Sequence, residues 1–442
     1  MNRQLLVILL SFLAASSAWG RSSPADDQAE QVKALLERVE QLEKRVSELE
    51  VKPGASAAPV LTAADRSIAQ KPEPQGAASA SPAQAHDHMA PEQTVAQQAE
   101  VHYPSLQIRG FGDVDFSATD EPKTTSGFNL GQLDLHLASP LSRKITYFGE
   151  ITFNAHPNGY TVEVERNIIR YDYNDYFKLS FGRYHTPIGY WNTAFHHGAW
   201  LQTTIDRPEI VKFGGTFIPV HFVGFLVEGN IPSGGAGLSY NVGLGDGRGE
   251  IISRPGDAGD VNNNRAWVAN IFARPVKLYG LELGASVYRD KINCQNNPLV
   301  PVVPGCHLTN GKDYREWITS AHVVWTKGAP EFLAEFVNAN HRQVLTDQTS
   351  NSQGLYTQFG YRLPWFENTL KPYYRFEYIH TPRSEAVFSN LDLVESIVGI
   401  RYDISNYAAF KGEYRHASRN VLETPTYNGT VNGLFFQTAF TF

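Results

Sequence analysis

The last eleven residues of the chain, 432–442, read NGLFFQTAFTF and decide the fold class. Leu434, Phe436, Thr438, Phe440 and Phe442 alternate there with Phe435, Gln437, Ala439 and Thr441. Because successive side chains of a strand point to opposite faces, one face of this segment is strongly apolar. The pattern predicts a membrane-spanning strand that lies between lipid and a polar lumen.

The N-terminus has the features of a secretory signal peptide. Arg3 supplies a positive charge, residues 5–15 are apolar, and Ala18-Trp19-Gly20 places small residues before a cleavage point after Gly20. No later stretch approaches the ~18 apolar residues that a spanning helix needs. We therefore expect residues 1–20 to be removed on export, and an exported chain without such a helix is either soluble or a barrel.

The charges and cysteines narrow the function classes. The 442 residues contain 38 Lys and Arg and 45 Asp and Glu, and this acidic balance argues against nucleic acid as a partner. The two cysteines, Cys294 and Cys306, lie in one stretch rich in Asn, Pro and Gly. In an exported chain they are expected to form one local disulfide, and the alternative is a free or metal-binding pair.

Residues 21–52 contain a heptad repeat that predicts a self-associating coiled coil. Its core positions are Val32, Leu35, Val39, Leu42, Val46 and Leu49. Arg38 and Arg45 occupy g positions, and Glu43 and Glu50 occupy the following e positions, so the flanking charges are opposite in sign. A single amphipathic helix is the alternative. Residues 53–103 are mainly Ala, Pro, Gln and Ser, which predicts a disordered linker.

From residue 104 onwards the sequence predicts sixteen strands. They are expected at 104–116, 127–138, 144–154, 160–172, 176–183, 219–229, 235–243, 264–273, 280–289, 315–326, 331–340, 353–363, 370–380, 393–403, 407–417 and 432–442. The connections after even strands are short, and most of those after odd strands are long, including 184–218, 244–263, 290–314 and 341–352. Such alternation is typical of membrane barrels, whose short turns face the periplasm. Residues 104–442 therefore read as an all-β, sixteen-stranded antiparallel transmembrane barrel.

The alternation also assigns side chains to the lumen. In the third strand Glu150 falls on the polar face, and Ile151 falls on the apolar one. Around residues 165–169 the pattern slips by one position, which predicts a β-bulge there.

The longest connection, 184–218, is the first candidate functional segment. It contains several aromatic residues and the histidines His185, His196 and His197. A loop of this length is usually functional, and a sixteen-stranded barrel leaves a wide aqueous lumen that must be narrowed to the size of a solute. We expect this loop to fold inward as a constriction, with Asp206, Arg207 and Glu209 on it.

This segment resembles a known family. The run from Gly182-Arg183 through Pro187-Ile188-Gly189 to Asp206-Arg207-Pro208 is similar to the strand-to-constriction-loop junction of Gram-negative outer-membrane porins. The chain more narrowly resembles the phosphate-selective porin O and P group and the DcaP-type porins, which carry an N-terminal coiled coil. A C-terminal strand ending in Phe also resembles the assembly signal of outer-membrane barrels. The resemblance implies an outer-membrane homotrimer with its coiled coil in the periplasm.

A second candidate feature is the charge on the lumen wall. On the predicted registers the inward residues include Arg109, Asp113, Glu150, Arg375, Arg401, Lys411 and Arg415. Basic residues on one arc facing acidic ones would create a transverse field that filters solutes by charge, with a mild preference for anions. The alternative is that these charges pair with one another and only keep the lumen wet.

Metal and enzyme interpretations have weaker support. His185, His196 and His197 could hold a divalent cation, and barrels described as zinc-regulated receptors resemble this junction. Adjacent histidines rarely bind one ion together, so hydrogen-bonded loop histidines are the preferred interpretation, and no resident metal or cofactor is expected. The sequence has no G-x-S-x-G or H-E-x-x-H motif, which argues against hydrolases.

These observations predict a passive diffusion channel for small hydrophilic, and in particular anionic, solutes in outer-membrane lipid. A metal-directed uptake protein and a barrel that tethers the membrane to the cell wall through its coiled coil are the alternatives.

Overall fold

The computed structural model describes residues 103–442 except 196, 213–216, 250–251, 253–256, 258, 261, 294–312, 389–390 and 422–428. The predicted signal peptide, the coiled coil at 21–52 and nearly all of the linker at 53–103 lie outside the described residues, as do His196 and the pair Cys294 and Cys306. In the described part of the chain, no helix is long and apolar enough to cross a membrane.

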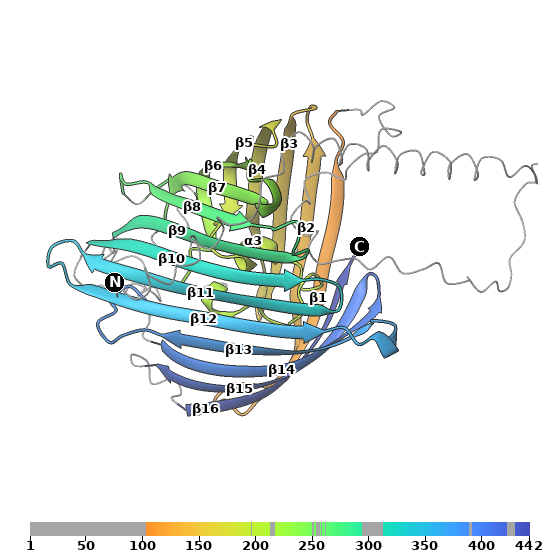
Figure 1. Ribbon diagram of the computed structural model, residues 1–442. Coiled ribbons are helices and arrows are strands. Elements are labelled where there is room, and N and C mark those ends of the chain that lie inside the picture. Colours follow the sequence, from red (N-terminus) through yellow and green to blue (C-terminus); the bar gives the residue numbers. More distant parts are fainter. Residues whose placement is uncertain are drawn as a thin grey trace, which may run out of the picture. The chain divides into compact units, whose positions relative to one another are not determined.

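Sixteen antiparallel strands form one closed barrel, and Figure 1 shows them following one another around it in sequence order. The prediction of the strand number is confirmed. The strands are β1 Gln107–Thr119, β2 Gly127–Pro140, β3 Ile145–His156, β4 Gly159–Asn174, β5 Phe177–His185, β6 His221–Ile231, β7 Leu238–Asp246, β8 Ala266–Ala273, β9 Leu281–Asn293, β10 Asp313–Thr326, β11 Pro330–Gln343, β12 Thr349–Tyr361, β13 Leu370–His380, β14 Leu391–Ser405, β15 Ala408–Val421 and β16 Gly429–Thr441.

The last strand closes the barrel and has the two faces that its sequence predicts. β16 pairs with β1, where Asp113 lies opposite Ala439 and Asp115 opposite Gln437. Gln437 is buried on the inner face, whereas Leu434 and Phe436 are exposed on the outer one. Closure leaves no free sheet edge, so every strand of the barrel has a partner on both sides.

Most connections alternate in length as predicted, but one predicted long connection is short. Residues 341–352 were predicted as a long connection, but β11 and β12 extend into them and leave only 344–348 as a turn. The physical reason is that polar cross-strand pairs, such as Asn340 with Asn351 and His341 with Ser350, continue the ladder without an apolar signal. The connection between β3 and β4, at 157–158, is also short although it follows an odd strand.

The outer face of the barrel is apolar, as expected of strands that contact lipid. Its exposed residues include Phe128, Leu130, Val162, Val164, Phe181, Val323, Phe336, Val398 and Ile400. Aromatic side chains flank this band at its two ends, such as Trp317 at one end and Tyr171, Tyr402 and Tyr407 at the other. Aromatic girdles around an apolar band are typical of membrane barrels.

The predicted bulge in the fourth strand is confirmed. Glu150 pairs with Arg166 and Ile151 with Val164, so Glu165 is the extra residue of β4. The bulge lets the adjacent side chains of Glu165 and Arg166 both turn to the inner face, where Glu165 contacts His221 and Arg166 contacts Glu150. The fold here directs two opposite charges into the interior.

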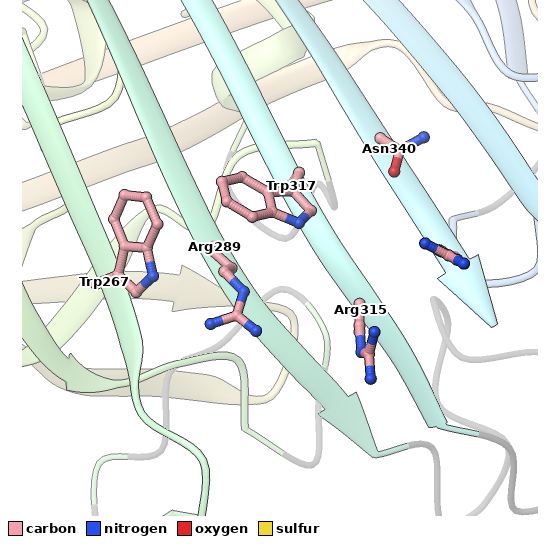
Figure 2. A pocket seen from close by; sticks show the side chains of 6 residues that line it. Trp267, Arg289, Arg315, Trp317 and Asn340 are labelled. Carbon is pink, nitrogen blue, oxygen red and sulfur yellow. The ribbon is translucent and has the colours of Figure 1, made fainter. Parts of the chain in front are cut away.

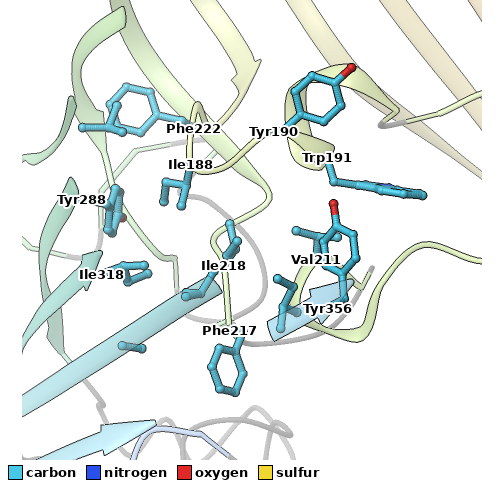
Figure 3. Packing of buried hydrophobic residues seen from close by; sticks show 14 of the residues in the cluster. Ile188, Tyr190, Trp191, Val211, Phe217, Ile218, Phe222, Tyr288, Ile318 and Tyr356 are labelled. Carbon is cyan, nitrogen blue, oxygen red and sulfur yellow. The ribbon is translucent and has the colours of Figure 1, made fainter. Parts of the chain in front are cut away.

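The interior of one half of the barrel is filled. Along β10 the inner side chains are buried at every second position, and β11, β12 and β13 show the same alternation. The material that fills this half is the connection between β5 and β6, residues 186–220, which we call the inner loop. Figure 3 shows its residues Ile188, Trp191, Val211 and Ile218 packed with strand residues such as Tyr288, Ile318 and Tyr356.

Two glycines make room for the inner loop. A Cβ atom added to Gly354 of β12 would lie 2.5 Å from the Cγ2 atom of Ile210, so this strand position must stay small for the loop to approach. Gly189 has a φ of 70°, in the left-handed region, and a Cβ atom there would lie 2.0 Å from the Oε2 atom of Glu335. A larger residue at either position would collide with its neighbour and displace the inner loop.

Candidate functional site: the inner loop and its anchors

The base of the inner loop is closed by its own backbone and by one asparagine. The Thr186 amide donates to the Val220 carbonyl at 3.0 Å. The Asn192 side-chain amide donates to the carbonyls of both Thr186 and Val220 at 2.9 Å, and Asn192 is fully buried. The two ends of the loop are therefore held together, so the middle of the loop can be directed across the barrel as one unit.

The first anchor on the wall is Glu335 of β11. Its carboxylate accepts hydrogen bonds from the backbone amides of Tyr190 and Trp191, each at 2.7 Å, and from the Tyr356 hydroxyl at 2.5 Å. Tyr190 is the N-cap of the short helix α3, Trp191–Ala194, and Trp191 is its first residue, so neither amide has a partner within the helix. A buried carboxylate satisfies them and fixes the start of the loop on β11.

The second set of anchors comes from the predicted basic arc. Lys411 donates to the carbonyls of Ala199 and Thr204 at 2.6 and 2.8 Å, and Arg401 donates to those of Trp200 and Gln202 at 2.9 and 2.7 Å. Arg375 adds bonds to the Thr204 hydroxyl and the Asp206 carbonyl at 2.9 and 2.7 Å. These bonds hold residues 199–206 along β13, β14 and β15.

The basic arc is therefore largely covered by the loop. Lys411, Arg375 and Arg401 are 0%, 1% and 6% exposed. These three side chains face inward as predicted, but they donate to backbone carbonyls and pair with neighbours such as Asp403 and Glu377. Lys371 of β13, which the sequence interpretation did not single out, belongs to the same set and bonds to Glu331 and Thr203 at 2.5 and 2.9 Å.

A more exposed charge group lies at one side of the arc. Arg415 forms ion pairs with Asp206 of the loop and Glu413 of the wall, both at 2.5 Å. The Asp206 side chain is 60% exposed, so this pair is accessible to water. Glu209 binds the wall through its backbone amide, which donates to Glu377 at 2.6 Å, and its carboxylate pairs with Lys212 of the loop.

The opposite wall contacts the loop through histidines and carboxylates. His197 of the loop lies 3.6 Å from Asp134 of β2 and 3.6 Å from Glu165 of β4, and the Gly198 amide donates to Asp134 at 3.1 Å. Burial alone would lower the pKa of His197, but the carboxylates of Glu165, Glu150 and Asp134 outweigh it and raise that pKa. The loop thus reaches from β13–β15 on one side to β2 and β4 on the other.

Glu150, predicted to face the lumen, is the centre of a buried charge cluster on this wall. Its carboxylate contacts Arg166 at 2.5 Å, His136 at 2.8 Å and His185 at 3.4 Å, and it is 0% exposed. Arg207 of the loop is buried nearby in the interior and donates to Asn192 at 3.3 Å. The cluster therefore joins β2, β3 and β4 behind the loop.

A further network, not predicted from the sequence, lies at the end of the interior that carries the long connections. Arg248, in the connection between β7 and β8, contacts both oxygens of Glu316 at 2.9 and 3.0 Å and donates to the Phe217 carbonyl at 3.1 Å. His341 lies between Glu316 and Glu385 at 3.1 and 2.9 Å. Three connections, 186–220, 247–265 and 381–390, thereby converge on one buried chain of charges.

Glu385 carries the third connection in this chain. It accepts bonds from the hydroxyls of Ser350 and Ser352 at 3.0 and 2.9 Å and from the Val387 amide at 2.8 Å. Burial alone would raise the pKa of Glu385, but the hydrogen bonds and charge of His341 lower it to about 2. Glu385 is therefore ionised across the physiological range and pairs with His341.

The structure separates the predicted site residues into groups. It brings together Asp206, Glu209, Arg375, Arg401, Lys411 and Arg415 on one side of the loop, and Glu150, His185 and His197 on the other. Arg109 lies at the start of β1 and is exposed, away from the loop anchors. Asp113 faces inward beside the β2 backbone, where it accepts the Gln132 amide at 3.3 Å. A signal for the missed residues was present, because Glu316, Glu331, Glu335 and His341 all occupy inward positions of β10 and β11.

The histidines were also considered as metal ligands. Among the described residues, which do not include His196, no group of three or more His, Cys, Asp and Glu side chains has the geometry to hold a metal ion. His185 of β5 and His221 of β6 lie with ring centres 5.6 Å apart, and they contact Glu150 of β3 and Glu165 of β4 respectively. These histidines therefore contact carboxylates of the neighbouring strands.

The comparisons with known proteins agree with this architecture. No protein-family model matches the chain, and no curated protein matches it in sequence. Its fold is similar to that of an anion-selective porin from Comamonas acidovorans, at 10% identity and a TM-score of 0.55, covering 77% of this chain and 100% of that one. It is also similar to the outer-membrane channel DcaP of Acinetobacter baumannii (14% identity, TM-score 0.51, 77% and 97% covered) and to Salmonella typhi OmpF in complex with daunomycin (14%, 0.52, 76% and 97%). At these identities the likeness establishes the fold, a closed sixteen-stranded barrel of the kind seen in Gram-negative outer-membrane porins.

Proposed function

We propose that the protein is an outer-membrane porin, a passive diffusion channel whose bore is narrowed by the inner loop. The barrel type, the apolar outer band and the porin folds to which it is similar support this assignment. A sixteen-stranded barrel is wide enough to leave an aqueous channel. Its substrates would be small hydrophilic solutes.

The observation that carries the proposal is the anchoring of the inner loop on opposite walls. Lys411 and Arg401 hold it to β15 and β14, and Asp134 and Glu165 hold it to β2 and β4. A structural anchor has no need for a loop braced across its interior. A channel that discriminates by size does, because the constriction must keep a fixed geometry against thermal motion.

We propose that the charge preference is weak. The sequence predicted a mild anion preference from the basic arc, but the loop covers Lys411, Arg375 and Arg401. The more accessible interior charges occur in opposite pairs, such as Arg415 with Asp206 and Arg170 with Asp172. The resemblance to phosphate-selective and DcaP-type porins makes phosphate and small carboxylates the first solutes to compare with neutral sugars of similar size.

A planar-bilayer measurement tests the channel. We expect the purified protein to give stepwise, ohmic conductance increments, because a fixed constriction passes ions without a gating motion. In a tenfold salt gradient the zero-current potential should stay well short of the ~59 mV that full selectivity for one monovalent ion would give.

The control for this measurement is the same preparation after heat denaturation, which should be silent. Insertion without any conductance would reject the channel and favour a barrel that only tethers the membrane. Conductance that closes on addition of zinc would favour a metal-directed uptake protein instead.

We further propose a homotrimer, with the coiled coil at 21–52 adding to barrel-to-barrel contact from the periplasmic side. Val32, Leu35, Val39 and the following core positions would pair between chains. The mass of the detergent-solubilised protein should correspond to three chains. Deletion of residues 21–52 should lower the temperature at which the oligomer dissociates, and an unchanged temperature would show that the segment does not drive assembly.

A further inference from the structure

A basic and aromatic cluster lies on the outer face of the barrel, outside everything assigned above. It consists of Trp267, Arg289, Arg315, Trp317, Asn340 and Arg342, which line a hollow of about 330 Å³ on β8 to β11. Figure 2 shows the labelled members of this outer-face cluster projecting from neighbouring strands. Each alternates with a buried inward neighbour, such as Tyr288, Glu316 or His341, so the cluster faces away from the interior.

The cluster sits at the end of the barrel that carries the long connections. β8 begins directly after residues 247–265, and β9 ends where residues 294–312 begin. Trp267 and Arg289 lie near these strand ends, as do Trp317 and Asn340. In the proposed membrane placement this is the interfacial level of the outer leaflet, where Trp side chains are favoured and charges are far less costly than at the midplane.

Two rows of paired residues build the cluster. In one row Arg289 lies opposite Trp267 on β8 and Trp317 on β10. The two indole rings meet edge to face with centres 5.5 Å apart, and the Arg289 guanidinium lies 5.7 Å from the Trp317 ring centre. The aromatic rings thus hold one guanidinium against the barrel wall.

The other row places like charges side by side. Arg315 lies directly opposite Lys291 on β9 and Arg342 on β11, an arrangement that is unfavourable by itself. Lys291 pairs with Asp313 at 2.8 Å, and Arg342 pairs with Asp347 at 2.9 Å. Arg342 is the main cause of the lowered pKa of Asp347, and the charge of Arg315 makes a smaller contribution.

The charge balance of the patch is therefore positive. Across the described residues, neither Arg289 nor Arg315 forms an ion pair with a carboxylate. A guanidinium presents several donors in a planar fork that matches the oxygens of a phosphate group. An anion placed between these two arginines would relieve the repulsion along the second row. It would also accept hydrogen bonds from the guanidinium N–H groups of Arg289 and Arg315.

We propose that this cluster binds the phosphate-bearing headgroup of a lipid in the leaflet that surrounds this end of the barrel. Arg289 and Arg315 would contact the phosphate oxygens. Asn340 lines the hollow but donates its side-chain amide to Asn351 and Ser350 of β12, so the two arginines carry the contact. The Trp267 and Trp317 rings lie on the membrane side, where acyl chains begin. The inference rests on the membrane placement of the proposed function but not on conduction.

The test is lipid retention by the purified, detergent-solubilised chain, followed by native mass spectrometry. The probes are diphosphorylated lipid A, phosphatidylethanolamine and inorganic phosphate. We expect wild type to retain lipid A in preference to phosphatidylethanolamine, whose headgroup is neutral overall. The variant R289Q/R315Q should bind lipid A about tenfold more weakly, since about 1.4 kcal/mol lost corresponds to that factor.

Matched controls keep the result specific. K277Q/K327Q removes two exposed basic residues from the short turns at the other end of the same strands and should retain lipid A as wild type does. R289K/R315K keeps the charge but not the planar fork and should give intermediate retention, which also covers the case in which the glutamine variant fails to fold. Bilayer conductance of each variant separates failure of the channel proposal from failure of this one.

Three outcomes would overturn the proposal. Undiminished lipid A retention by R289Q/R315Q would show that the cluster does not hold it. Displacement of lipid A by inorganic phosphate at equal concentration would assign the site to a free anion. A change in oligomer mass in the variant, with lipid retention unaltered, would identify the surface as a contact between copies of the chain.

Discussion

Replacement of Arg248 with Met should lower the free energy of unfolding by about 3–5 kcal/mol, the cost of leaving a buried charge without its partner. Arg248 and Glu316 are both completely buried, and the guanidinium contacts both carboxylate oxygens. Methionine keeps most of the volume of the side chain but none of its donors. Glu316 would keep only His341, which already pairs with Glu385.

The loss should be visible as a lower temperature for the change from the folded to the unfolded band in unboiled gels, and as a lower urea midpoint. The matched control is R265M in the same connection between β7 and β8. Arg265 pairs with Asp260 and Asp246, but its side chain is 49% exposed, so water can replace much of what it contributes and its loss should cost clearly less than that of Arg248.

A second control isolates the unpaired charge as the cause. The double variant R248M/E316Q removes the carboxylate charge together with its partner, so it should recover part of the stability that R248M loses. Equal losses for R248M and R265M would mean that the buried chain of charges contributes no more than the ion pairs of the half-exposed Arg265. No recovery in the double variant would point to lost packing against Phe388, over whose ring the guanidinium lies.

The strands could be predicted from the sequence because lipid-facing apolar residues and inward polar residues alternate along each strand of a membrane barrel. Val394 and Val398 are exposed outside, and Glu395 is buried inside, as their alternation indicates. The rule failed where both faces are polar. At residues 341–352 no apolar face marks the strands, and the ladder is visible only in the pairing of Asn340 with Asn351.

The site was less predictable, for two physical reasons. Lys411 and Arg401 bind backbone carbonyl oxygens of the inner loop, and every residue offers a carbonyl, so the sequence carries no signal for the partner. The length and aromatic content of 184–218 indicated a functional loop, but not which wall it packs on. That choice depends on side chains far away in the sequence, such as Glu335 and the small residue Gly354.

Release of the inner loop from β14 and β15 should widen the channel. The variant R401M/K411M removes four hydrogen bonds to the carbonyls of Ala199, Trp200, Gln202 and Thr204. Asp403 keeps Arg362 as an ion partner, so the wall itself is not left with an unpaired carboxylate. Because an unfilled barrel of this strand number leaves an open aqueous channel, the single-channel conductance should rise by about twofold or more.

The size of the conductance step and the zero-current potential, measured on the same bilayer, separate the two roles of these basic residues. If Arg401 and Lys411 act as anchors, the step grows and its spread between single channels widens, because residues 199–206 no longer hold one position. If they act as lumen charges, the step keeps its size and the potential moves towards cation preference. The matched control is R170M, which should leave the step size unchanged, since within the described ranges Arg170 bonds to the wall residues Asp172 and Glu228 and not to the inner loop. An unaltered step in R401M/K411M, with folded protein confirmed by its gel mobility, would mean that Glu335, Arg375 and the carboxylates of β2 and β4 hold the loop without them.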